Sequence, residues 1–141
     1  MKRKAGKALA LVLAILTVCV LAGCSPFQRK LDTTVYDEEE MKELAMQIVL
    51  YMAEDDYDPI LAMVNETVAD AITKEVLENA NEQMRLKGGY FVKFGKVQVT
   101  GDKGDDEPLC KVTVTAQHGK RAFTYTLIFN TEKKIVSLYL I

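Results

Sequence analysis

The sequence contains few of the residues on which enzymes and metalloproteins commonly rely. It has one histidine and three cysteines in 141 residues. The zinc-protease motif H-E-x-x-H, the nucleophile motif G-x-S-x-G, paired C-x-x-C motifs and the glycine-rich phosphate loop are all absent. The reaction classes that these motifs define are therefore excluded. The sequence predicts no catalytic residue, no metal site and no cofactor.

Positive charge is also scarce outside the N-terminus. Residues 1–23 hold four of the 18 basic residues and none of the 20 acidic ones, so the remainder has 14 basic against 20 acidic residues, a net charge of −6. No basic patch with interleaved aromatic residues occurs. We therefore expect neither nucleic acid nor an anionic lipid surface as an electrostatic partner.

A long apolar run occurs only once, at the N-terminus. Four basic residues in the first seven are followed by the uncharged run 8–22. This run is short for a bilayer span of about 20 residues and has the length of a secretory signal core. The pattern predicts a signal peptide over residues 1–23 that is removed.

The run ends in Leu21-Ala22-Gly23-Cys24, which resembles the lipobox of bacterial lipoproteins. In that family the cysteine thiol receives a diacylglyceryl group and a dedicated peptidase cuts just before it. The resemblance implies that Cys24 is the lipidation site and that Leu21, Ala22 and Gly23 are recognised by the peptidase. Two acyl chains of the palmitate type, each contributing about 0.8 kcal/mol per buried methylene, would hold the chain stably on a membrane. We expect a lipid-anchored protein on the extracytoplasmic face of the bacterial cell membrane; the alternatives are an ordinary signal peptide and an uncleaved anchor.

The cysteine at position 110 would have no partner once Cys24 is alkylated. Cys110 belongs to an alternating pattern in which apolar residues occupy every second position between 110 and 116. The alternation predicts a strand with the thiol on its apolar face. We therefore expect Cys110 to be a buried and unreactive residue.

Helical periodicity dominates the first half of the chain after a short tether over residues 24–36. Asp37 is predicted to cap a helix that ends near Ala53. Asp58 and Pro59 predict the cap and first residue of a second, short helix. Thr73 is predicted to cap a third helix that ends at glycines 88 and 89 and buries Val76, Leu77, Ala80 and Met84.

From residue 90 onward the apolar period changes to two. The pattern predicts a long strand over 90–100 that bends at Gly95, followed by strands over 109–117, 120–129 and 135–141. His118 and Gly119 form a two-residue connection suited to a primed hairpin turn, which would leave His118 in solvent. The order of elements predicts one α+β domain over residues 37–141, with N-terminal helices packed on a curved four-stranded antiparallel sheet in a cone-like, cystatin-like arrangement.

Three short segments resemble the nuclear-transport-factor-2-like superfamily, and more narrowly an uncharacterised family of exported bacterial domains. They are Glu54-Asp55-Asp56-Tyr57, the segment 72–77 (ITKEVL) and Gly88-Gly89-Tyr90-Phe91. The resemblance implies the cone fold and an exported location. Related enzymes that isomerise or dehydrate small molecules hold a carboxylate or a histidine inside the cone as acid or base.

The residues expected to face the inside of the cone are mostly apolar. The possible pocket lining comprises Tyr90, Phe123, Tyr125, Leu127, Phe129 and Tyr139. Such a lining could bind a small apolar ligand, or the cone could be packed shut as core. We therefore expect a non-catalytic domain that binds an envelope protein or a small apolar ligand. The alternative is an isomerase or dehydratase that uses a carboxylate such as Asp70 inside the cone.

Overall fold

A computed structural model of the chain describes residues 29–104 and 106–141. The predicted signal peptide and the lipobox residues Leu21 to Cys24 lie outside these described residues. In order, the elements are α2 (Glu38–Ala53), α3 (Asp58–Met63), the 3-10 helix η1 (Glu66–Val68), α4 (Lys74–Gly88), β1 (Phe91–Lys103), β2 (Pro108–His118), β3 (Ala122–Phe129) and β4 (Ile135–Leu140).

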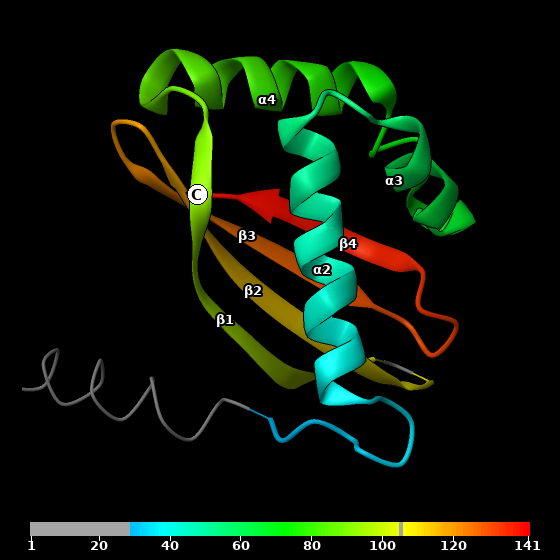
Figure 1. The fold of residues 1–141 in the computed structure, drawn as a ribbon. Coiled ribbons are helices and arrows are strands. Elements are labelled where there is room, and N and C mark those ends of the chain that lie inside the picture. Colours follow the sequence, from blue (N-terminus) through cyan, green and yellow to red (C-terminus); the bar gives the residue numbers. More distant parts are fainter. Residues whose placement is uncertain (1–28, 105) are drawn as a thin grey trace, which may run out of the picture.

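The four strands form one antiparallel sheet in the order β1-β2-β3-β4, with the helices gathered on one side (Figure 1). Helix α2 runs along the sheet over β1 and β2, and α4 crosses one end of the sheet. The predicted α+β fold, with helices ahead of a four-stranded antiparallel meander, is confirmed.

Both long helices begin at the predicted capping residues. The Asp37 carboxylate accepts a hydrogen bond from the Glu40 backbone N–H at 2.9 Å, and the Thr73 hydroxyl accepts one from the Val76 N–H at 3.3 Å. Each bond satisfies a backbone donor that the first helical turn leaves free. The short helix α3 starts at Asp58 itself, one residue earlier than predicted, with Tyr57 in the capping position.

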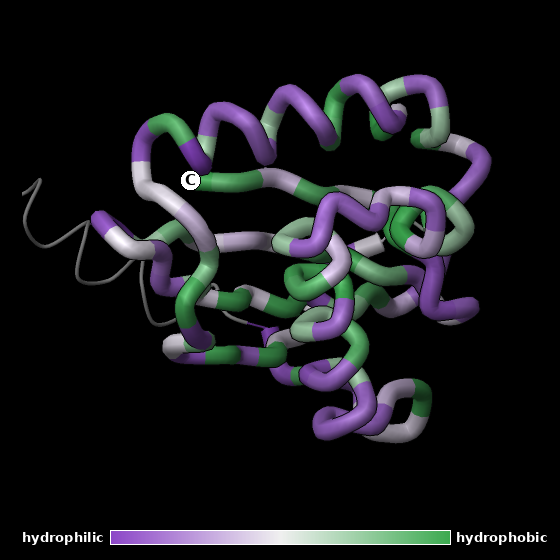
Figure 2. Tube along the Cα trace, turned by 45° about the horizontal axis from the view of Figure 1, so that its top comes forward, coloured by the Kyte–Doolittle hydropathy of each residue, from purple (hydrophilic) through white to green (hydrophobic). Residues whose placement is uncertain are grey.

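The buried face of α4 differs from the prediction at one position. Val76 is 49% exposed, whereas Asn81 is 2% exposed and lies with Leu77 and Met84 against the core. Figure 2 shows α4 mostly in the hydrophilic colour, with hydrophobic positions recurring along it. The assignment of Val76 to the core is therefore wrong, because the face that packs inward is the one that carries Asn81.

The sheet has the predicted alternation and the predicted bend. On β2, Cys110, Val112, Val114 and Ala116 are fully buried. The pairing of β1 with β2 shifts register between Phe94 and Val97, which places an irregularity at Gly95. Strand β1 also extends to Lys103, further than predicted, so the charged loop after it is shorter.

The residues before α2 are packed against the domain. The Gly101 N–H donates to the Arg29 carbonyl at 2.8 Å, which adds a short bridge to the free edge of β1. Tyr36 is 2% exposed, and its hydroxyl donates to the Pro108 carbonyl at 2.7 Å. Burial raises the pKa of Tyr36 to about 12. The domain therefore begins before Asp37, and residues 29–36 are part of it.

Within the described residues, no helix is both long enough and apolar enough to span a membrane.

Candidate functional site

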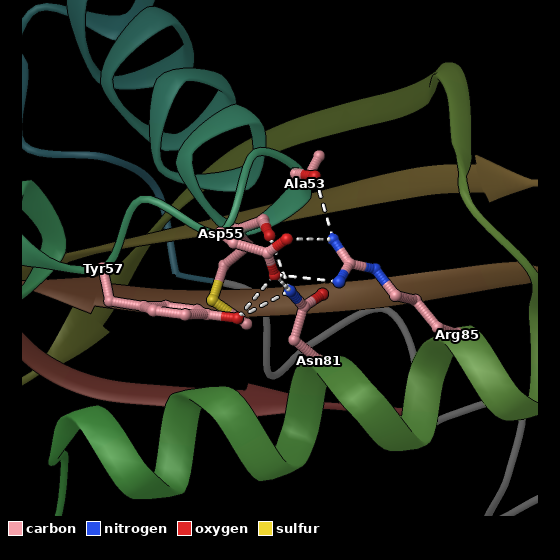
Figure 3. A network of polar contacts seen from close by, with 6 residues as sticks. Ala53, Asp55, Tyr57, Asn81 and Arg85 are labelled. Carbon is pink, nitrogen blue, oxygen red and sulfur yellow. Dashed lines mark hydrogen bonds and ion pairs between the residues drawn. The ribbon is translucent and has the colours of Figure 1, made fainter.

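A polar network joins the end of α2 to α4 around Asp55 (Figure 3). Asp55 has a positive φ of 58°, in the left-handed region that aspartate tolerates better than most residues. Its carboxylate forms an ion pair with Arg85 at 2.9 Å through each oxygen. It also accepts hydrogen bonds from the Tyr57 hydroxyl and the Asn81 amide, both at 2.9 Å.

The same donors also satisfy the end of helix α2. Asn81 Nδ2 lies 2.7 Å from the Met52 carbonyl, and Arg85 Nη2 lies 3.2 Å from the Ala53 carbonyl. Both carbonyls belong to the last turn of the helix, whose carbonyls have no partner within the helix, and the Met52 carbonyl also accepts from the Asp55 N–H at 3.2 Å. The network therefore caps α2 with side chains from α4 and fixes the angle between the two helices.

The charges in the network stabilise one another. Hydrogen bonding from Arg85 is the main reason that the pKa of Asp55 lies below its usual value. Hydrogen bonding with Asp55 in turn raises the pKa of Arg85, while burial raises the pKa of Tyr57. A groove of about 410 Å³ lies beside the network, between Asp55 and the residues Lys74, Glu78 and Glu82. Because Asp55, Tyr57 and Arg85 each have partners within the network, the arrangement is suited to holding the two helices together.

His118 lies inside the domain, and its predicted exposure is wrong. It is 4% exposed, and its Nδ1 lies 2.7 Å from the Gly89 carbonyl. His118 continues the buried alternation of residues 110, 112, 114 and 116 on β2, so the alternation itself could have revealed its position.

The turn at His118 is held against the end of α4. The Lys120 N–H donates to the Gly88 carbonyl at 2.8 Å, and the Gly119 N–H donates to the Tyr90 carbonyl at 3.1 Å. The His118 N–H donates to the Arg121 carbonyl at 2.9 Å, so Gly119 and Lys120 form the connection. Gly119 does not adopt a positive φ, and the predicted primed turn is therefore not formed.

The second ring nitrogen of His118 has no hydrogen-bond partner among the described residues. The ring packs edge-on against Phe123, with 4.8 Å between the ring centres, and against Phe91 at 6.2 Å. Nδ1 donates to the Gly89 carbonyl, and Nε2 lies inside an aromatic cluster. The sequence analysis therefore missed the burial of His118, the one histidine of the chain.

The residues predicted to line a pocket divide into two groups. Tyr90 is 72% exposed and Tyr139 is 45% exposed, so their assignment to the inside of the cone is wrong. Tyr90 stacks against the Arg85 guanidinium at 5.1 Å, and Tyr139 lies on the outer face because its neighbours Leu138 and Leu140 pair with inward-facing residues of β3. The other four lie on the inner face of β3 and are buried: Phe123, Tyr125, Leu127 and Phe129.

The inner face of β3 is packed as core. Leu127 and Phe129 are fully buried, and the Tyr125 hydroxyl donates to Met84 Sδ at 3.5 Å. Burial is the main cause of the raised pKa of Tyr125. Of the four residues, Phe123 reaches a surface groove of about 320 Å³, which lies between α4 and the strands β3 and β4. The groove is lined by Ala80, Gln83, Met84, Lys87, Arg121, Phe123, Leu140 and Ile141.

The described acidic residues lie outside the core, whereas the free thiol lies inside it. Asp70 is exposed, and none of the described aspartates and glutamates is buried. Cys110 is fully buried, and burial raises its pKa to about 12, which disfavours the thiolate. No group of three or more potential metal-binding side chains comes together within residues 29–104 and 106–141.

The architecture defines a class of small α+β domain in which helices cover one face of an antiparallel meander. Within that class, the chain belongs to the family described as protein of unknown function (DUF3887), whose family model matches residues 45–138. The matched segment includes the network around Asp55, the buried His118, the strands β1 to β3 and the first four residues of β4.

A solved structure shares this fold. It is the NMR structure of a protein from Ruminococcus gnavus ATCC 29149, which is 19% identical, with a TM-score of 0.68 over 79% of this chain and 96% of that one. At this identity the likeness shows the fold alone. Among proteins with curated descriptions, no match to the chain is found.

Proposed function

We propose that the protein is a lipid-anchored, extracytoplasmic lipoprotein whose folded domain binds a ligand or partner without catalysing a reaction. The observation that carries the proposal is the sequence Leu21-Ala22-Gly23-Cys24, which closes an apolar run behind a basic N-terminus. Only four residues lie between Cys24 and Arg29, so an anchor at Cys24 would hold the start of the domain within about 20 Å of the membrane surface.

The packed interior supports a binding role over a catalytic one. The inner face carries aromatic and aliphatic side chains, and its one phenol, Tyr125, is engaged with Met84. General acid–base catalysis needs a titratable group within reach of a substrate. None of the described carboxylates is buried, and Asp70, the residue that the enzymatic alternative would use, is exposed.

Membership of the nuclear-transport-factor-2-like superfamily is part of the same proposal. It is supported by the order of helices and strands and by the three sequence segments that suggested it.

The anchoring is tested by metabolic labelling with an alkyne fatty acid in a bacterial host that expresses the full chain. We expect the wild-type chain to incorporate the label and to lose residues 1–23. Cys24→Ser should abolish both labelling and cleavage, because the serine hydroxyl is a far weaker nucleophile than a thiolate. Cys19→Ser is the matched control and should label normally. Labelling that persists in Cys24→Ser would refute the proposal.

One observation favours an enzymatic alternative. His118 is buried beside Phe91 and Phe123 with an unpartnered Nε2, and histidine is a common acid or base. Turnover of a small molecule by the purified protein, lost in a folded His118→Gln variant, would favour this alternative over the binding role.

A further inference from the structure

The groove at the end of α4 combines an apolar floor with a positively charged rim. Met84, Phe123 and Leu140 contribute to the floor, and Lys87 and Arg121 lie at the rim. The volume of about 320 Å³ is at the lower end of the range for small-molecule sites, roughly 300–1,000 Å³. The groove can therefore accommodate one short alkyl chain but not a large folded partner.

The rim cations are available for a ligand. Among the described residues, neither Lys87 nor Arg121 forms an ion pair with an acidic side chain, although four other ion pairs are present. The Arg121 guanidinium lies 4.8 Å above the centre of the Phe123 ring. This stacking holds the positive charge next to the apolar floor and leaves the guanidinium edge free to donate hydrogen bonds.

The groove also exposes apolar surface to water. Ile141 lines the groove and is 75% exposed, and Phe123 reaches the groove from the core. An alkyl chain that covered this surface would be stabilised by removing apolar area from water. The positive charge of the rim favours an alkyl chain with an anionic head group, because an anion would pair with Lys87 and Arg121.

The position of the groove argues against a lipid that remains in the bilayer. The N-terminal segment joins the sheet where Arg29 pairs with Gly101, near the far end of β1. The groove lies at the opposite end of the sheet, where α4 leads into β1 (Figure 1). The ten residue steps along β1 from Phe91 to Gly101 correspond to about 30 Å of strand. A chain anchored near Arg29 would therefore present the groove to the aqueous side.

We infer that this groove binds a monomeric anionic amphiphile, a short alkyl chain with a carboxylate or phosphate head group. The alkyl chain lies on Met84, Phe123 and Leu140, and the head group is held by Lys87 and Arg121. The inference rests on the binding role proposed above and identifies the chemical class of ligand.

The test uses the full chain purified from bacterial membranes and placed in nanodiscs of zwitterionic lipid, with a diazirine-bearing decanoate as the photo-crosslinking probe. We expect the probe to label peptides that contain Met84 or Phe123, and decanoate or decyl phosphate to compete. Decanol and decyltrimethylammonium should compete at least about tenfold more weakly, since they lack the anionic head. Adding an anionic phospholipid to the nanodisc should not reduce labelling; if it does, the ligand is a bilayer lipid and the inference is wrong.

Charge reversal tests the rim. Lys87→Glu combined with Arg121→Glu should weaken labelling at least about tenfold, since it turns two attractive charges into repulsive ones. The matched control is Lys93→Glu combined with Lys96→Glu, which makes the same change in net charge at exposed positions of β1 and should label as the wild type does. Equal labelling by both double variants, or competition by decanol equal to that by decanoate, would overturn the inference. Either result would leave lipid labelling of Cys24 unaffected, so the two proposals fail separately.

Discussion

At the scale of single residues, Asp55 is the side chain on which the helical layer most depends. It is the acceptor that Tyr57, Asn81 and Arg85 share. Its side chain is 52% exposed, so solvent weakens each of these interactions. They stabilise the junction of the helices mainly as a group.

Replacing Asp55 with asparagine removes the charge but keeps a residue that tolerates a positive φ. We expect Asp55→Asn to lower the free energy of unfolding by about 1 kcal/mol at neutral pH. Urea denaturation of the purified protein measures this change. Asp56→Asn is the matched control, because the Asp56 carboxylate makes no hydrogen bond or ion pair among the described residues, and it should have almost no effect.

The comparison of wild type with Asp55→Asn also predicts how the free energy of unfolding depends on pH. The pKa of Asp55 is lower in the folded protein than in the unfolded chain, so its contribution is complete above the unfolded-state value of about 3.9. The contribution is lost as the pH falls through the lower, folded-state value. The difference in free energy of unfolding between wild type and Asp55→Asn should therefore shrink in strongly acidic solution. A difference that stayed constant down to about pH 2 would show that charge is not the cause.

Sequence reasoning could find the caps and the alternating core but not the partners of polar residues. Asp37 and Thr73 act within their own helices, so local sequence is sufficient to identify them. Asn81 and His118 are buried because residues distant in the chain, such as Met52 and Gly89, supply their hydrogen bonds. Both residues lie at periodic positions, but a polar side chain at such a position is ordinarily expected in solvent.

At the scale of elements, the junction between α4 and the turn between β2 and β3 keeps the end of the sheet closed. Gly88 is the residue that permits the close approach. A Cβ atom there would lie 2.8 Å from Phe123 Cζ and 3.0 Å from Arg121 Cγ, closer than packed atoms allow.

We expect Gly88→Ala to destabilise the protein by about 1–2 kcal/mol, because crowding against Phe123 outweighs the better helix propensity of alanine. The urea midpoint should fall accordingly. Gly119→Ala serves as the control, since the nearest atom to an added Cβ is the Gly88 carbonyl oxygen at 3.9 Å, an ordinary contact. Equal midpoints for the two variants would mean that the junction is less tightly packed than described.

The arrangement of the elements also explains why two of the predicted pocket residues, Tyr90 and Tyr139, lie outside the core. Tyr90 follows Gly89, whose φ of 79° turns the chain before β1 begins. Tyr139 is outward because β4 pairs with β3 so that Leu138 faces Leu127. A hydrophobic pattern cannot determine such a register when both faces of a strand carry large apolar residues.

At the scale of the whole molecule, the two ends of the domain have different roles in our account. The end that receives Arg29 would lie near the membrane, and the end that carries the groove would face outward. The change from a helical period to a period of two near residue 90 predicts the fold class, because helices that precede an antiparallel meander can pack in few arrangements. The groove could not be predicted, because Lys87, Arg121 and Leu140 come together only in the folded chain.

We propose above all that the chain is anchored through Cys24. The most direct test is to identify the N-terminal peptide of the protein purified from membranes. Mass spectrometry of that peptide should show a chain that begins at Cys24 and carries the mass of a diacylglyceryl group on its sulfur. A peptide that begins at any other residue, or at Cys24 with an unmodified thiol, would contradict the account.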